Sequence, residues 1–330
     1  MIMKLHLYII VSIIVKHVIN IIYQFKFNFM EMFNKKVLRG RIGNLKKHSA
    51  LNALEQVESY AIRKMSEYGI EYSYDVMAEE MPFFNTFAYT SYATSFLFQP
   101  LNSKLRNEMM TDAWYDNESK VLDWSSYLIS NVLDGTSNKY QDREMEYEKY
   151  PPRDYLMVLP GSNKVKTNIC LNRMKFIHKK RAGNLYVKPH PITTHKIIGE
   201  LKDLFGEDSV LPRNVDMYYY MQKARGVYTT HISESALYAS LLGKKIEPFD
   251  VWNDIRYGSF YTINNYLFTN QHNIKNYVNK TFSSYKSGII NPNVDKNWKL
   301  KIDKYLAYMM KKRSVYQNWF IDSRVPKNKK

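Results

Sequence analysis

Two short motifs carry side chains that could bind an anionic ligand, and the first holds a histidine. In NLYVKPHP (residues 184–191), His190 stands between two prolines directly after a short apolar run. Proline fixes its own φ and pushes the residue before it toward extended geometry, so Pro191 restrains His190. An imidazole held in this way can hydrogen-bond an anion and, when protonated, neutralise it. Lys188 adds a positive charge close by, and the combination suits a nucleotide phosphate, with Lys188 and Pro191 as candidate donor-binding residues.

The second motif, THISESALYASLLGKK (residues 230–245), contains two serines at the start of a predicted helix. Free backbone N–H groups and the helix dipole favour an anion at such a start, which makes Ser233 and Ser235 candidates for phosphate binding. The alternative is that Ser233 only caps the helix and His190 only bonds to backbone. His231, in the same motif, lies close to Ser233 and could line the pocket, but we favour its interpretation as a solvated loop histidine.

Strands that alternate with helices are predicted from residue 154 to residue 249, and each of the two motifs follows one of these strands. In a parallel, doubly wound α/β sheet, ligands bind beyond the carboxyl ends of the strands, and both motifs fall at that edge. Gly161 and Ser162, directly after the first strand, form a candidate phosphate-contacting turn or a plain β-to-α loop. The predicted strands are 154–161, 185–188, 209–211, 226–230 and 244–249, and the predicted helices are 167–180, 193–206, 216–224 and 233–243.

The first half of the chain gives weaker patterns. Residues 49–69 have apolar positions at helical spacing and end in a glycine, which predicts a helix. Residues 83–98 are aromatic and β-branched and could form a strand pair or a buried helix. Residues 125–140 predict a helix or strand that ends at the turn dipeptide Asp134-Gly135. The charged run 141–154 resembles a linker and predicts a boundary near residue 150.

The composition predicts a globular protein with an affinity for anions. Of the 330 residues, 45% are hydrophobic and 24% are charged, which argues against disorder. The single cysteine, Cys170, excludes an internal disulfide framework and a multi-cysteine metal site. The formal net charge of +17 favours nucleic acid, acidic glycans, anionic lipid or phosphorylated substrates as partners, with a generic basic surface as the alternative. No zinc-finger spacing or RNA-binding aromatic signature points to nucleic acid.

Residues 1–29 are strongly apolar, but Lys16 and His17 interrupt them before a clean membrane span is reached. The segment also lacks the cleavage site of a signal peptide. It could be a poor anchor, an interfacial amphipathic helix, or upstream sequence translated from an early start codon, with Met30 or Met32 as the natural start. We favour the third interpretation, and expect a cytoplasmic protein, with association at the inner face of the membrane as a further option.

Three motifs in order, LDGTSNKY (133–140), KPHP (188–191) and THISESALYASLLGKK (230–245), resemble those of bacterial sialyltransferases. The Asp/Glu-Gly, His-Pro and Ser motifs occur in the same order in polysialyltransferases and capsule Kdo transferases. The resemblance covers roughly residues 130–250. Leu133 stands where that family often carries a second acidic residue.

This resemblance implies a metal-independent glycosyltransferase of the GT-B kind, with two Rossmann-like domains and the active site in the cleft between them. The donor would be a CMP-activated acidic sugar and the acceptor an anionic glycan, with no further cofactor. Asp134 would be the general base, His190 would bind or protonate the departing CMP phosphate, and Ser233 and Ser235 would donate hydrogen bonds. Glu79, Glu80, Asp112 and Asp116 are the next candidates for the base.

The domains expected on this basis are an apolar extension (1–29), an acceptor domain (30–150), a nucleotide-sugar domain (151–290) and C-terminal helices with a basic tail (291–330). The C-terminal helices are expected to pack on the first domain. Two alternatives differ in function: a glycosyltransferase that modifies hydroxymethylated bases of viral DNA, and a non-enzymatic α/β protein that binds polyanions. Salt-sensitive DNA binding would distinguish the first alternative, and absence of nucleotide-sugar turnover the second.

Overall fold

The computed structural model of the chain describes most of the residues after position 50. The described residues are 51–68, 71–74, 86–92, 95–100, 103–133, 148–160, 170–191, 193–250 and 261–324. By its contacts the chain divides between Lys46 and Lys47, and every described residue belongs to the unit Lys47–Lys330. The apolar segment 1–29 lies outside the described residues. Within the described ranges, no helix has both the length and the apolar character that a bilayer span requires.

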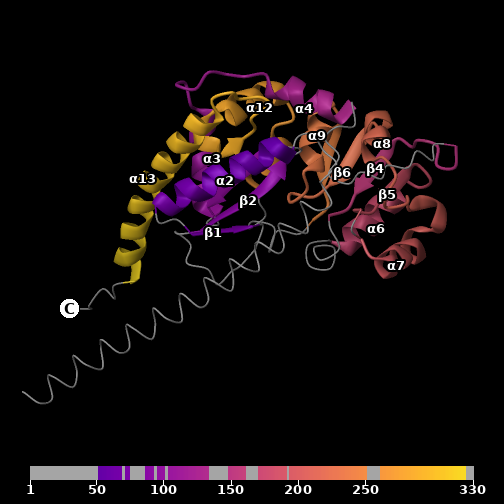
Figure 1. The fold of residues 1–330 in the computed structure, drawn as a ribbon. Coiled ribbons are helices and arrows are strands. Elements are labelled where there is room, and N and C mark those ends of the chain that lie inside the picture. The colour runs from indigo at the N-terminus through magenta and orange to yellow at the C-terminus, as the bar shows by residue number, and fades with distance from the viewer. Residues whose placement is uncertain are drawn as a thin grey trace, which may run out of the picture. The chain divides into compact units, whose positions relative to one another are not determined.

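A parallel sheet of four strands forms the centre of the second half of the chain (Figure 1). Its order is β5-β4-β6-β7, and all three pairings are parallel. The chain moves from β4 outward to β5 and then crosses back to β6, so the direction of winding reverses between β4 and β6. The predicted α/β class is therefore confirmed. The strands are β4 (Tyr155–Val158), β5 (Leu185–Lys188), β6 (Gly226–Thr229) and β7 (Lys245–Pro248).

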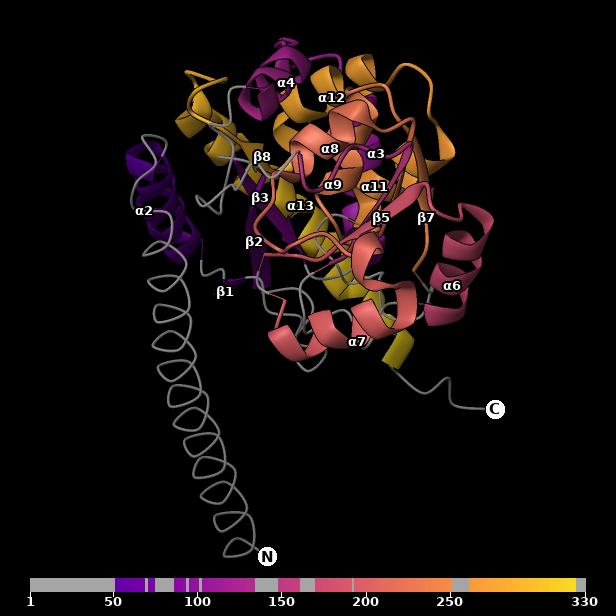
Figure 2. The same cartoon turned by 90° about the vertical axis from the view of Figure 1, so that its right-hand side faces the viewer.

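Helices cover both faces of this sheet, as a doubly wound arrangement requires. Alternate strand residues point to opposite faces: Met157 and Leu159 pack with α6 and α7, whereas Leu156 and Val158 pack with α8 and α9. Figure 2 shows the two pairs of helices on opposite sides of the sheet. The helices are α6 (Leu171–Lys180), α7 (His195–Phe205), α8 (Met217–Lys223) and α9 (Ser235–Leu241).

Helix α7 has the boundaries that its sequence predicts. The Thr194 side chain accepts a hydrogen bond from the Ile197 N–H at 3.5 Å, and Gly206 ends the helix with a φ of 88°. A positive φ is easily adopted only by glycine, which explains the residue at this position. The expected short strand at 209–211 is instead a 3-10 turn, η1 (Glu207–Ser209), followed by a bridge between Val210 and Val187.

The first half of the chain contributes a second sheet of order β1-β2-β3-β8. The described residues of the aromatic segment 83–98 belong to a strand pair rather than to a buried helix, because β2 and β3 pair antiparallel. The segment after residue 123 forms a helix, α4. The elements are α2 (Leu51–Glu67), β1 (Glu71–Tyr74), β2 (Thr86–Tyr92), β3 (Ser95–Pro100), α3 (Ser103–Trp114) and α4 (Trp124–Leu133).

The last part of the chain returns to the first half. Strand β8 pairs antiparallel with β3, and α13 packs against α2. The Tyr60 hydroxyl donates to the Asp303 carboxylate at 2.8 and 3.0 Å, and the Tyr60 ring meets Trp298 edge-on at 5.5 Å. The expected packing of the C-terminal helices on the first half is confirmed. The elements are α11 (Tyr261–Thr269), α12 (Ile274–Ser283), η2 (Tyr285–Ser287), β8 (Ile289–Ile290) and α13 (Trp298–Arg324).

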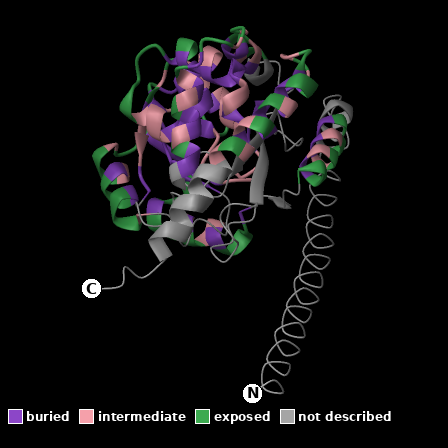
Figure 3. Ribbon diagram, turned by 90° about the vertical axis from the view of Figure 1, so that its left-hand side faces the viewer, coloured by how far each residue is buried: buried purple, intermediate pink, exposed green. Residues whose placement is uncertain are grey.

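One hydrophobic core extends across residue 150. Trp124 and Leu128 of α4 belong to the same buried cluster as Leu156 of β4 and Leu237 of α9. In Figure 3 the buried stretches of the described residues, in purple, gather in the interior, and exposed stretches, in green, lie on outer turns. The division near residue 150 into an acceptor domain and a nucleotide domain stays a prediction.

Candidate functional site

The carboxyl ends of the parallel strands lie level with one another and carry the two predicted motifs. Val158 pairs with Lys188 across β4 and β5, and Thr229 pairs with Pro248 across β6 and β7. His190 follows β5 and Ser233 follows β6, and these strands flank β4. Adjacent strands are about 4.8 Å apart, so the ends of β5 and β6 are separated by about 10 Å. The two motifs therefore share one edge, beside the β4–β6 reversal where doubly wound sheets bind ligands.

The histidine of the first motif sits in a tight turn. The His190 carbonyl accepts a hydrogen bond from the Thr193 N–H at 2.8 Å, which closes a four-residue turn. Pro191 occupies the second position of this turn, where its fixed φ is favourable. His190 itself is half-buried. The proline after the histidine thus sets the backbone of a turn at the sheet edge.

Lys188 holds this turn in place and is almost completely buried, with 2% of the residue exposed. Its ammonium donates to the carbonyls of Pro189 and Arg213, both at 2.8 Å. Arg213 in turn donates to the Thr193 carbonyl at 3.1 Å. Burial lowers the pKa of Lys188 to about 7. The structure gives Lys188 a role in holding the turn, and its contact with a donor nucleotide stays a prediction.

The serines of the second motif form a chain of hydroxyl groups. Ser235 Oγ lies 2.5 Å from Thr229 Oγ1 and 2.7 Å from Ser233 Oγ. Thr229 and Ser235 are buried, and Ser233 is the half-buried end of the chain. Because each hydroxyl donates one hydrogen, a chain that runs from Thr229 outward leaves the Ser233 hydrogen for a ligand. Of the two serines, Ser233 is therefore the better placed for direct contact with a ligand.

Helix α9 is a weaker anion site than the sequence suggests, because it has only seven residues. Glu234 occupies its N-cap position without a capping hydrogen bond from the side chain. The cap contact comes from Ser233, whose Oγ accepts the Ser235 N–H at 3.3 Å. Ser233 therefore precedes the N-cap residue rather than occupying the N-cap position itself, although its hydroxyl accepts from the first N–H of the helix.

His231 is buried, so its interpretation as a solvated loop residue is wrong. Its Nδ1 lies 2.8 Å from Asp250 Oδ1, and its backbone N–H donates to Asp250 Oδ2 at 2.7 Å. An ionised carboxylate can only accept, so Nδ1 carries the hydrogen of this contact. His231 and Asp250 each stand two residues beyond the ends of the paired strands β6 and β7. Only the order of the strands reveals that they meet.

A buried amide fixes the same loop from the other side. Asn264 of α11 is fully buried, and its Nδ2 donates to the carbonyls of His231 and Ser233 at 2.8 and 2.7 Å. The buried atoms without a hydrogen-bond partner among the described residues include Thr230 Oγ1 and Asn264 Oδ1, both at this loop. The hydrogen bonds therefore hold the loop 230–234 rigidly, and some buried polar atoms at the loop could still form further hydrogen bonds.

Three of the predicted site residues, Asp134, Gly161 and Ser162, lie outside the described residues. Asp134 directly follows α4, and α4 packs against α9, which begins with Ser235. Its assignment as the base stays a prediction.

Two of the other candidates for the base make structural contacts. Asp116 is buried and accepts from Ser284 at 2.6 Å and Ser119 at 2.7 Å. Asp112 bonds to Tyr308 and pairs with Lys312 of α13 at 2.9 Å. Both carboxylates hold elements together, whereas Glu79 and Glu80 lie outside the described residues.

Within the described residues, no group of three or more His, Cys, Asp or Glu side chains could hold a metal ion. No protein-family model matches the chain, and no curated protein is significantly similar to it.

Proposed function

We propose that the protein is a glycosyltransferase that transfers an acidic sugar from a CMP-linked donor to a glycan acceptor such as surface polysaccharide or lipooligosaccharide. The proposal includes a GT-B arrangement with a second Rossmann-like half that provides the acceptor side of the cleft. The observation that carries it is the position of the His-Pro and Ser motifs at one edge of a parallel sheet, on the strands that flank β4. This edge is where doubly wound sheets bind nucleotides.

In the proposed reaction the bond between the anomeric carbon of the sugar and the phosphate oxygen breaks, and CMP leaves. An acceptor hydroxyl forms the new bond to that carbon and gives up its proton. We assign this proton to the Asp134 carboxylate, on the resemblance of LDGTSNKY to the acidic motif of sialyltransferases. General-base catalysis of this kind contributes about a hundredfold to ten-thousandfold in rate.

His190 and Ser233 are assigned to the departing phosphate, whose negative charge grows as the bond to the sugar breaks. A donor that is fixed before the reaction stabilises this charge without reorganising. Pro191 and the Thr193 hydrogen bond restrain the backbone of His190, whereas Asn264 holds the carbonyl of Ser233. Ser235 acts through Ser233, since its hydroxyl lies between Thr229 and Ser233.

The first test is nucleotide binding by the purified full-length chain. A ligand that binds only the folded protein raises its melting temperature by mass action. We expect CMP to raise the melting temperature, and UDP and GDP to have no comparable effect. If none of the three raises it, the nucleotide site is wrong and a polyanion-binding protein without enzymatic activity becomes the better description.

The second test is turnover of CMP-linked sialic acid and Kdo, followed through the release of CMP. His190→Ala should weaken CMP binding and abolish transfer, because the imidazole contacts the leaving group throughout. Asp134→Ala should keep CMP binding and lower turnover by roughly a hundredfold or more. His272→Ala changes an exposed histidine far along the chain and should leave both unchanged.

A DNA acceptor would give different results in the transfer and binding experiments. In that case duplex DNA with hydroxymethylated bases would accept the sugar, and binding to DNA would fall steeply as salt is raised. Transfer to DNA but not to a glycan would overturn the glycan acceptor and leave the roles of His190 and Ser233 intact.

A further inference from the structure

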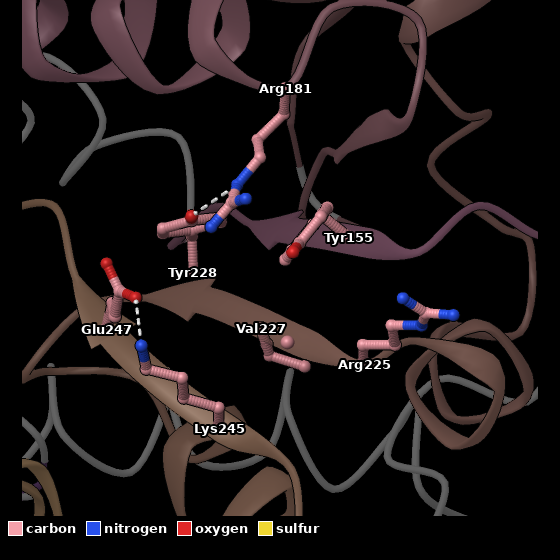
Figure 4. A pocket seen from close by; sticks show the side chains of 8 residues that line it. Tyr155, Arg181, Arg225, Val227, Tyr228, Lys245 and Glu247 are labelled. Atoms are coloured by element: carbon pink, nitrogen blue, oxygen red, sulfur yellow. Dashed lines mark hydrogen bonds and ion pairs between the residues drawn. The ribbon is translucent and has the colours of Figure 1, made fainter.

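A hollow lies at the amino ends of the same strands, on the opposite edge from His190 and Ser233. It is an open pocket of about 170 Å³ on the sheet face that α6 covers in part. Figure 4 shows Arg181 reaching between Tyr228 and Tyr155, with Lys245 and Glu247 on the adjoining strand. The strands are four residues long, so the two edges are roughly 13 Å apart. This pocket is thus separate from the proposed glycosyltransferase site.

The pocket exists because a glycine interrupts a row of side chains. Tyr155, Gly226 and Lys245 lie side by side in register across β4, β6 and β7. Gly226 has no side chain, so the Tyr155 ring lies against its backbone. A Cβ added at Gly226 would come within 3.3 Å of two ring carbons of Tyr155, tighter than ordinary contact. The glycine therefore opens the hollow and seats the tyrosine ring at its base.

Arg181, directly after α6, is held in a fixed orientation over this base. Its guanidinium carbon lies 3.8 Å from the centre of the Tyr155 ring, and its Nε donates to the Tyr228 hydroxyl at 3.0 Å. The two terminal nitrogens of Arg181 have no hydrogen-bond partner among the described residues. A guanidinium stacked and oriented in this way presents a two-pronged donor, the geometry that fits a carboxylate or a phosphate.

The other charged groups of the pocket favour an anion as well. Lys245 and Arg225 line the pocket with Arg181, against one lining carboxylate, Glu247. Glu247 pairs with Lys245 at 3.2 Å, and Arg225 pairs with Asp154 outside the pocket at 3.6 Å. Because both ion pairs are largely exposed, the carboxylate of each pair attracts its Lys or Arg partner only weakly.

We propose that this pocket binds the oxyanion group, phosphate or carboxylate, of a small molecule, with Arg181 as the principal donor. The anion accepts two parallel hydrogen bonds from the terminal nitrogens of Arg181, while Lys245 supplies a second positive charge. Tyr155 and Tyr228 fix the guanidinium before the ligand arrives, so little conformational entropy is lost on binding. The site does not depend on the glycosyltransferase proposal.

The test measures binding of inorganic phosphate and of acetate to the full-length chain at constant ionic strength. The dissociation constant comes from the dependence of the melting temperature on anion concentration. All variants are made in a His190→Ala background, so that any contribution of an anion at the carboxyl edge is weakened and is the same in every variant. We expect saturable binding of at least one of the two anions, and the one that binds identifies the group as phosphate or carboxylate.

Arg181→Lys keeps the charge but loses the two-pronged donor, and it should weaken binding roughly tenfold or more. Arg173→Lys makes the same change at an exposed position of α6 and should have no effect. Glu247→Gln removes the opposing carboxylate and should tighten binding roughly twofold to fivefold. If Arg181→Lys fails to fold, Tyr228→Phe serves instead, since it removes only the hydroxyl that orients Arg181.

The proposal is overturned if neither anion binds saturably. It is equally overturned if Arg181→Lys and Arg173→Lys bind the anion with the same affinity. Since CMP binding at the carboxyl edge is measured in the wild-type background, its failure would leave this site unaffected.

Discussion

At the scale of single residues, buried polar side chains hold the loops of the carboxyl edge. Lys188 ties the turn after β5 to Arg213, whereas Asp250 and Asn264 hold the loop after β6. A buried polar group is costly unless it is hydrogen-bonded, so each of these contacts allows few alternative loop geometries. A ligand site built on such loops needs little rearrangement before it binds.

The pH dependence of stability should report the burial of Lys188. Burial lowers its pKa in the folded protein to about 7, against an ordinary value of 10.5. Between these values the unfolded chain binds this proton and the folded protein does not, so stability rises with pH across that window. Replacing Lys188→Met removes this rise, about 1.4 kcal/mol per pH unit at its steepest. Urea unfolding between pH 7 and pH 10 measures the slope.

Lys196→Met, at an exposed position of α7, is the control and should keep the wild-type slope. The pKa of Lys301 is likewise lowered by burial to about 7, so its own contribution remains in both variants. An unchanged slope in Lys188→Met would mean that this ammonium is not desolvated in the folded protein.

At the scale of elements, α13 joins the end of the chain to the first half. Its buried residues recur with the helical period and form one apolar stripe. Polar contacts flank the stripe: Asp303 accepts from Tyr60 of α2, and Lys312 pairs with Glu108 and Asp112 of α3. The stripe consists of Trp298, Ile302, Tyr305, Leu306 and Met309.

Two leucines of α13 provide a matched test of this packing. Leu306 is 1% exposed and Leu300 is 54% exposed. Leu306→Ala should lower the free energy of unfolding by about 2–5 kcal/mol, because it leaves a cavity in the core. Leu300→Ala should change it by no more than about 0.5 kcal/mol. Urea denaturation of both variants measures the difference, and equal effects would show that α13 does not dock along this stripe.

At the scale of the molecule, one buried cluster joins elements from both halves of the described unit, which contains two sheets. Side chains of α4, α9, α12 and the parallel sheet belong to one buried cluster, and β8 extends the first sheet. Elements that share buried surface gain their stability together. The two sheets are thus coupled energetically.

We therefore expect one cooperative unfolding transition for residues 47–330. Leu306→Ala near the first half and Leu185→Ala in the parallel sheet should each lower the midpoint of that same transition, since both residues are 1% exposed. Near-UV and far-UV circular dichroism during urea unfolding should give coincident curves. Two separate transitions, each sensitive to only one of the variants, would instead support independent domains.

Sequence alone determined the features that depend on near neighbours. The alternation of strands and helices after residue 154, the threonine cap and glycine end of α7, and the class of the sheet all follow from local pattern. Once the sheet is parallel, the residues after each strand must meet at one edge, which places His190 and Ser233 there. That inference required no knowledge of strand order.

The tertiary structure decided which of these residues touch. His231 and Asp250 meet because β6 and β7 are neighbours, and Arg181 reaches Tyr155 because Gly226 leaves room for the ring. Periodicity reports which face of an element is buried but not which element lies beside it. The burial of Lys188 and His231 and the anion pocket at the amino edge depend on that pairing, so only the folded chain reveals them.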